Sequence, residues 1–199
     1  MRNLTTSEDL KELYEKDFYM WVYENLKLLK EGKYDRVDWE NLLEEIEDMG
    51  KTLKRSLISY IAVILEHMYK LENLLSYSRY DTDMLEEGGR GWKRSIANAS
   101  IEIEKILDDS PGLLRQLEDI TRQAWKYARK SLTAFIMDLE EGRIVSISER
   151  EQLLRSIPKE LPYTIEQIAG RITELTEDEN NAFAQYMQRY KKGQKPGKP

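Results

Sequence analysis

The chain has 199 residues, of which 40% are hydrophobic and 34% charged, and it carries a formal net charge of −6 with no cysteine. The lack of cysteine excludes disulfides and thiolate metal sites, and no apolar run approaches the length of a membrane span. The polar start lacks the apolar core of a signal peptide, so we expect a cytoplasmic protein of bacterial type. Net negative charge also disfavours nucleic acid as the main partner.

The first predicted helix follows Thr6 or Ser7, which are both good N-caps, and ends at Gly32. Its apolar residues recur at helical spacing and form a wide aromatic stripe that we expect to pack into the core. These residues are Leu10, Tyr14, Phe18, Trp21, Leu28 and Leu29.

Asp17 interrupts this stripe, because it lies three residues after Tyr14 and four before Trp21. We therefore expect its carboxylate to point inward, where it would need hydrogen-bond or charge partners. The expected donor comes from another helix and is Arg94, Arg129 or a tyrosine.

A longer helix is predicted from Asp38, its N-cap, to Leu75. Its apolar residues keep one helical phase: Trp39, Leu43, Ile46, Leu53, Leu57, Ile61, Ile64, Met68, Leu71 and Leu75. Gly50 falls on this stripe and indicates a kink, a break or the close approach of another helix. We expect a continuous or kinked helix, since a loop would lose the phase. In a straight helix, roughly 30 Å separates Glu47 from His67, so they belong to different sites.

The pattern dissolves between residues 76 and 91, which we predict to be a long surface loop. A third helix runs from Trp92 to at least Ile106, and a fourth begins with Pro111 in its first turn and ends at Gly142. Short helices follow, each with a predicted capping box. The pairs are Ser148 with Glu151, Thr164 with Gln167, and Thr176 with Glu179.

These elements predict an all-α fold, an antiparallel helical bundle of four long helices with short C-terminal helices. We place the bundle domain at residues 1–170 and a C-terminal helical extension at residues 171–190. Residues 191–199 have no apolar side chain to bury and are predicted to be a disordered basic tail. Its bases would bind nucleic acid only weakly.

Acidic residues form the sharpest candidate site, since residues 38–48 hold six acids and no bases. Glu40, Glu44 and Glu47 share one helix face. Together with Asp17 they are candidate ligands for Mg²⁺ or Mn²⁺, which prefer oxygen donors. The alternative is a solvated first turn, where carboxylates favour the helix dipole. No other cofactor is expected, and His67, at the edge of the apolar stripe, is interpreted as hydrogen-bonded structure.

Several motifs occur in a characteristic order along the chain. They are DFYMW (17–21), DWENLLEEIEDMG (38–50), the following helix with His67 and Lys70, WKRSI (92–96), DSPGL (109–113), YAR (127–129) and LPYTIEQ (161–167). In this order they resemble the domain of unknown function 29 family over about residues 8–170. The resemblance implies an all-α fold and a small bacterial protein, with no settled activity to carry over. Residues 78–91 and those after Gly170 depart from the family's usual pattern.

Two functions remain open. The leading hypothesis is a non-enzymatic protein–protein interaction module that binds a protein partner or forms a homo-oligomer. It rests on abundant amphipathic helix and on the absence of a catalytic motif such as G-x-S-x-G. The alternative is a metal-dependent hydrolase or ligand-binding bundle that acts on a phosphorylated small molecule through Asp17, Glu40, Glu44 and Glu47.

Overall fold

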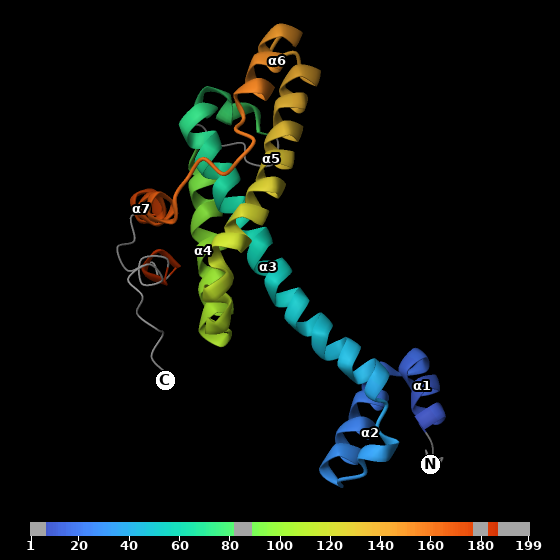
Figure 1. Ribbon diagram of the computed structural model, residues 1–199. Helices are drawn as coiled ribbons and strands as arrows, with labels where there is room; N and C mark the ends of the chain where they lie inside the picture. The colour runs from blue at the N-terminus through green and yellow to red at the C-terminus, as the bar shows by residue number, and fades with distance from the viewer. Residues whose placement is uncertain (1–6, 82–88, 177–182, 187–199) are drawn as a thin grey trace. The chain divides into compact units, whose positions relative to one another are not determined.

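The structure is a computed structural model that describes residues 7–81, 89–176 and 183–186 (Figure 1). These residues form helices and no strand, so the predicted all-α fold is confirmed. The chain divides into two compact units, residues 1–52 and residues 53–199. The predicted domain boundaries at residues 170 and 190 stay predictions, and the predicted basic tail lies outside the described residues.

The N-terminal unit contains α1 (Ser7–Lys16), α2 (Phe18–Lys30), the 3₁₀ helix η1 (Tyr34–Arg36) and the start of α3. The prediction of one helix up to Gly32 is wrong, because the chain leaves helical geometry at Asp17, with φ −152° and ψ 84°. The core of this unit is small. Its buried hydrophobic residues are Leu10, Trp21, Leu28 and Val37.

Helix α3 runs without a break from Trp39 to Asn73 and contributes residues to both units. The predicted continuity through Gly50 is therefore confirmed. A Cβ placed on Gly50 would meet nothing within 4 Å, so no neighbouring helix uses this glycine for close approach. The apolar residues keep the same helical phase before and after Gly50, and this pattern correctly predicted an unbroken helix. The glycine itself costs the helix only about 1 kcal/mol relative to Ala.

The second unit is built on α3 from Leu53 onward, α4 (Arg90–Asp109) and α5 (Leu117–Glu141). The 3₁₀ helix η2 (Leu75–Tyr80) follows α3, the 3₁₀ helix η4 (Pro111–Gln116) joins α4 to α5, and α4 runs opposite to α3 and α5 (Figure 1). A large core joins these helices, and its fully buried side chains include Leu57, Ile61, Trp92, Ile96 and Trp125. Three long helices thus share this core, whereas the first of the four predicted long helices is divided between α1 and α2.

Helices α6 (Ile147–Ser156) and α7 (Ile165–Thr176) complete the second unit, and residues 183–186 form a further helical turn. The capping box of α6 consists of Ser146 and Glu149, so the prediction of Ser148 with Glu151 is wrong by two residues. The box of Thr164 and Gln167 is confirmed by two reciprocal hydrogen bonds of 2.8 and 3.3 Å. The predicted box of Thr176 with Glu179 extends outside the described residues.

Candidate functional site

A buried polar network joins α2 to α3 in the N-terminal unit. The Trp21 Nε1–H donates to Asp38 Oδ2 at 3.0 Å, and the Asp38 N–H donates to Asn25 Oδ1 at 3.0 Å. Asn41 adds a side-chain bond to Asp38 of 2.7 Å and a longer backbone bond of 3.5 Å, which is the predicted helix cap. Asp38 is only 1% exposed and is fully engaged in holding the two helices together. Its role is therefore structural.

Asp17 does not point inward, contrary to the prediction. It is exposed, and its Oδ1 accepts the Met20 N–H at 3.1 Å, so that it caps α2. Arg129, one of its expected partners, donates instead to the Lys159 carbonyl oxygen at 3.4 Å. The spacing of Asp17 from Tyr14 and Trp21 was misleading because α2 begins directly after α1. An aspartate that caps the second helix then has the same spacing from apolar residues as a buried helix position.

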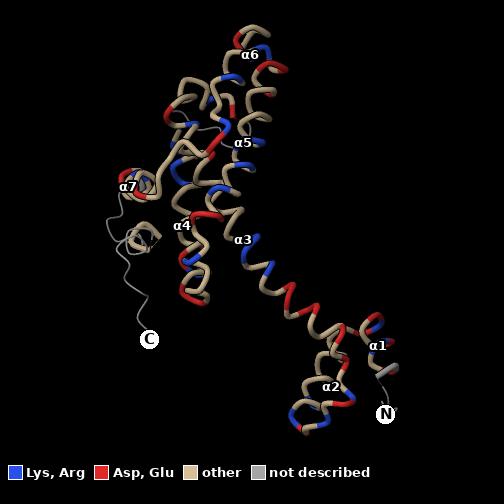
Figure 2. Tube along the Cα trace, in the orientation of Figure 1, with Lys and Arg blue, Asp and Glu red and all other residues tan. Residues whose placement is uncertain are grey.

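The three other candidate metal ligands, Glu40, Glu44 and Glu47, are exposed on α3. Figure 2 marks acidic residues of this helix in red. Glu40 pairs with Lys11 at 2.7 Å, and Glu47 pairs with Lys51 at 3.1 Å. In the part of the chain that the structure describes, no three His, Asp or Glu side chains converge in a way that could hold a metal ion. Mg²⁺ or Mn²⁺ binding by Asp17, Glu40, Glu44 and Glu47 stays a prediction.

Sequence reasoning missed the role of Glu45 beside these acids. The Tyr14 hydroxyl donates to Glu45 Oε1 at 2.6 Å, and the Tyr14 ring packs edge-on against Trp21 with centroids 4.9 Å apart. The hydrogen bond to Glu45 raises the pKa of Tyr14 to about 12. Part of the acidic cluster therefore ties α3 to α1.

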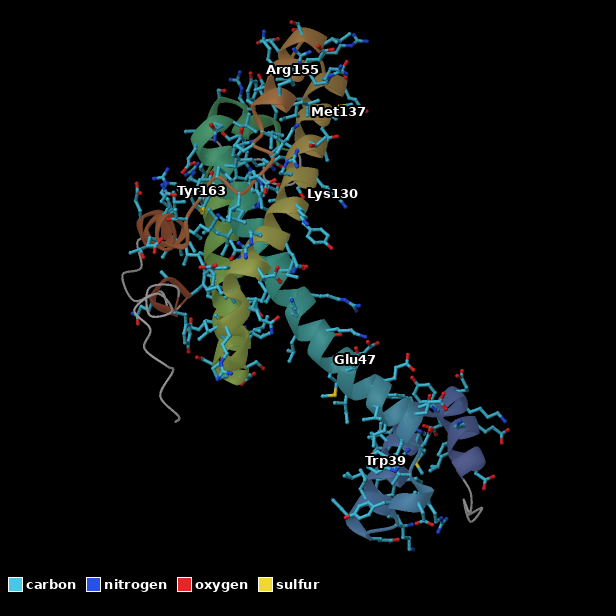
Figure 3. The ribbon with its side chains drawn as sticks, in the orientation of Figure 1. Trp39, Glu47, Lys130, Met137, Arg155 and Tyr163 are labelled. Atoms are coloured by element: carbon cyan, nitrogen blue, oxygen red, sulfur yellow. The ribbon has the colours of Figure 1, made fainter. Side chains whose placement is uncertain are left out.

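Two apolar stripes of the N-terminal unit are exposed. The one on α3 includes residues of the predicted stripe of the long helix, whereas the one on α2 lies outside the stripe predicted for the first helix. We call these two stripes the N-terminal apolar surface, and the residues of each recur at helical spacing. Its residues, with exposed fractions, are Tyr19 (76%), Val22 (42%), Tyr23 (54%) and Leu26 (46%) on α2, and Trp39 (45%), Leu43 (59%), Ile46 (57%) and Met49 (68%) on α3. Figure 3 labels Trp39 and Glu47 on this part of α3. In the long predicted stripe, the residues from Leu57 to Met68 are buried, whereas Leu75 at its end is again 45% exposed.

The net charge of the protein is also concentrated in this unit. Residues 1–52 contain 8 Lys and Arg and 14 Asp and Glu, a formal charge of −6, whereas residues 53–199 contain 23 of each. The N-terminal apolar surface therefore belongs to a strongly acidic unit.

The second unit contains a buried charged cluster centred on Lys70, which is 4% exposed. Lys70 Nζ lies 2.9 Å from Glu66 Oε1 and 3.0 Å from Asp81 Oδ2. The Trp92 Nε1–H donates to the same Asp81 oxygen at 2.8 Å, and the ammonium lies 4.2 Å from the centroid of the Phe135 ring. The sequence placed Asp81 in a surface loop. The position of Lys70 inside an apolar run could have predicted a buried acidic partner, because a buried charge requires a counter-charge.

His67 lies in the same cluster and is 5% exposed, with its ring stacked on Trp92 at 6.5 Å. Burial lowers the pKa of His67 to about 4, so the imidazole is neutral at neutral pH. Its Nδ1 atom is buried and has no hydrogen-bond partner among the residues that the structure describes. The hydrogen bond that we expected for a structural histidine is therefore missing at this atom.

This cluster forms one side of a pocket of about 420 Å³ between α3 and α5. Six polar or charged residues of its wall matter for its chemistry: Glu66, His67, Lys70, Asp81, Ser131 and Asp138. A pocket of this size with several convergent polar groups is typical of small-molecule sites.

The fold defines an all-α protein with an acidic N-terminal unit that exposes apolar residues, and with a second unit whose helices line an open pocket. No helix within the described residues combines the length and apolar character that a membrane crossing requires. The sequence profile of the family described as "Domain of unknown function DUF29" matches residues 13–171. The chain therefore belongs to this family, which confirms the resemblance seen in its motifs. No curated protein and no solved structure gives a significant match.

Proposed function

We propose that the protein is an interaction module whose N-terminal apolar surface binds an amphipathic helix rich in Lys and Arg from another protein. The observation that carries this proposal is the exposure of two helical apolar stripes in one small unit. Monomeric proteins rarely expose large contiguous apolar areas, and larger ones usually mark interaction sites. Stripes with helical spacing suit a helical partner, which would use anchors at the same spacing.

Charge favours a different protein over a second copy as the partner. Glu40, Glu44 and Glu47 lie beside the α3 stripe, in a unit whose formal charge is −6. Docking this surface on itself would bring two such units together, and like charges across an interface are unfavourable. A partner with basic residues around its apolar anchors would instead be complementary. We also place this function in the cytoplasm of a bacterium, an expectation that rests on the sequence.

The test is calorimetric titration of the full chain with two designed helical peptides. Both carry Leu at the same heptad positions, and one has Lys where the other has Glu at the flanking positions. We expect the Lys peptide to bind and the Glu peptide to bind at least about tenfold more weakly. Leu43→Ser combined with Ile46→Ser should weaken the Lys peptide by a similar factor.

Ile101→Ser is the matched control, because Ile101 is 49% exposed but lies on α4. It should leave binding unchanged. Equal binding of both peptides, or equal loss in the control, would contradict the proposal. Sedimentation of the unliganded chain should show a monomer, and a dimer that Leu43→Ser with Ile46→Ser dissociates would replace the basic partner by a second copy.

The metal-dependent alternative has a simple test of its own. If Glu44 binds Mg²⁺ or Mn²⁺, either ion at millimolar concentration should raise the melting temperature, and Glu44→Gln should abolish the rise. An unchanged melting temperature would leave these acids as a solvated face.

A further inference from the structure

The middle of α5 carries basic residues that no acid interrupts. Residues 120–137 contain Arg122, Lys126, Arg129 and Lys130 but no Asp or Glu. The acids of α5 lie only in its first and last turns. In the neighbouring α4, by contrast, four bases and four acids occur together. Positive charge is therefore concentrated on one helix of a unit that is neutral overall.

Three of these bases form what we call the α5 basic stripe. Arg122, Lys126 and Lys130 are spaced four residues apart, so they share one helix face, and all three are exposed (Figure 2). None of them forms an ion pair within the part of the chain that the structure describes. Asp119, at the start of α5, is already paired with Lys54 at 3.3 Å. The charge of the stripe is thus available to a partner.

An exposed aromatic ring lies beside the stripe. Tyr127 is 55% exposed, and Lys130 Nζ lies 5.5 Å from the centroid of its ring. Figure 3 labels Lys130 on α5. Tyrosine is enriched in protein interfaces because it combines a large apolar area with a hydrogen-bonding group.

The stripe does not stabilise the helix that carries it. The helix dipole favours bases only in the last turn, and these three residues lie in the middle of α5. Like charges four residues apart repel each other, which applies to Arg122 with Lys126 and to Lys126 with Lys130. An anionic partner would turn this repulsion into attraction.

We propose that the α5 basic stripe and Tyr127 bind an acidic helix of another protein. Helical residues four positions apart are separated by about 6 Å along the axis, so Glu or Asp at the same interval in the partner would face each base in turn. The stripe belongs to the second unit and the N-terminal apolar surface to the first. Neither proposal depends on the other.

The charge of the whole chain favours an acidic protein over a nucleic acid. The formal net charge is −6, and proteins that bind nucleic acid usually present a much more basic surface. Three phosphate contacts would also give only weak, salt-dependent binding. A short acidic helix needs no more positive charge than the stripe supplies.

The experiment measures fluorescence anisotropy of two labelled, alanine-based helical peptides titrated with the full chain at low ionic strength. Both peptides contain three Glu, placed four residues apart in the first and five apart in the second, which spreads them around the helix. We expect the first peptide to bind at least about fivefold more tightly, because only its carboxylates match the stripe. Salt should weaken this binding, since exposed ion pairs are screened.

Lys126→Gln combined with Lys130→Gln should weaken binding of the first peptide at least about fivefold. Tyr127→Ser should weaken it as well. The matched control is Lys93→Gln combined with Lys105→Gln, which removes two exposed bases from α4 and should leave binding unchanged. Unaltered melting temperatures would show that the variants fold. The stripe variant should also retain the binding of the Leu- and Lys-containing peptide to the N-terminal apolar surface.

Four results would overturn the proposal. They are the absence of binding by the first peptide, equal binding of both peptides, an equal loss in the α4 control, and tighter binding of a single-stranded oligothymidylate than of the first peptide. The last result would make a nucleic acid the partner of the stripe.

Discussion

The two units of this protein bury their apolar residues to very different extents. The N-terminal unit has four buried hydrophobic residues in its core, whereas α3, α4 and α5 of the second unit share a core of more than twenty. Of the exposed large hydrophobic side chains found among the described residues, 11 of 17 lie in residues 1–52. Small units bury a smaller fraction of their surface. The comparison teaches that the N-terminal unit leaves most of its large apolar side chains exposed, whereas the second unit buries most of its own.

The polar groups show the opposite distribution. The N-terminal unit carries the net charge and exposes most of it, whereas the second unit is neutral overall and buries Lys70 with Glu66 and Asp81. Buried ion pairs are costly to break because they leave a charge without a partner. Substitutions should therefore have larger effects on the stability of the second unit.

The largest effect is expected for Lys70→Met, which leaves Glu66 and Asp81 without their buried cation. We expect a loss of about 3–5 kcal/mol in the free energy of unfolding, measured by urea denaturation. Lys93→Met, at an exposed position of α4, should change it by no more than about 0.5 kcal/mol. Similar losses in both variants would mean that the Lys70 cluster contributes nothing special.

Two leucines of α3 provide a direct comparison of the units, because they lie on the same predicted stripe. Leu57 is fully buried and Leu43 is 59% exposed. Leu57→Ala should cost about 2–5 kcal/mol through lost burial and the cavity it leaves. Leu43→Ala should cost at most about 0.5 kcal/mol in the same denaturation experiment. A large cost at Leu43 in the isolated chain would show that this surface is buried in solution.

The pH dependence of stability should identify the buried imidazole. His67 has a pKa of about 4 in the folded chain, against an ordinary value of 6.5, because burial disfavours the charged ring. Below pH 6.5 the unfolded chain binds a proton that the folded chain does not, so stability falls as the pH falls. Between pH 6.5 and 5.0 this loss amounts to about 2 kcal/mol. His67→Gln should remove that part of the pH dependence, and an unaltered slope would contradict burial of the ring.

The smallest effect concerns the cap of α2. Asp17→Ala should destabilise the N-terminal unit by about 1 kcal/mol, because the Met20 N–H loses its acceptor. Asp17→Asn should restore most of this stability, and Glu15→Ala serves as a nearby exposed control. Amide hydrogen exchange in α2 is the appropriate measurement, since it reports on this unit alone. Unchanged exchange in Asp17→Ala would exclude the capping role.

The helices themselves could be predicted because their signals are local. The start of α3 after Asp38, its continuity through Gly50 and the Thr164 capping box all depend on residues within a few positions of each other. The break at Asp17 was missed because one aspartate satisfies two local patterns, an interrupted stripe and an N-cap. The α6 box was misplaced by two residues for another reason, because Ser146 with Glu149 and Ser148 with Glu151 have the same spacing.

The functional surfaces depended on tertiary structure. Periodicity identified one apolar stripe on α3, but only packing decides that its residues from Leu57 to Met68 are buried and that Trp39, Leu43 and Ile46 are exposed. The pocket has the same origin, since Asp81 reaches Lys70 only because η2 returns the chain toward α3. Sequence alone thus determined the all-α class, the family and most helix starts, because these follow from local hydrogen bonding and helical period. Tertiary structure decided which apolar face remains exposed and which charges meet, because both depend on contacts between distant segments.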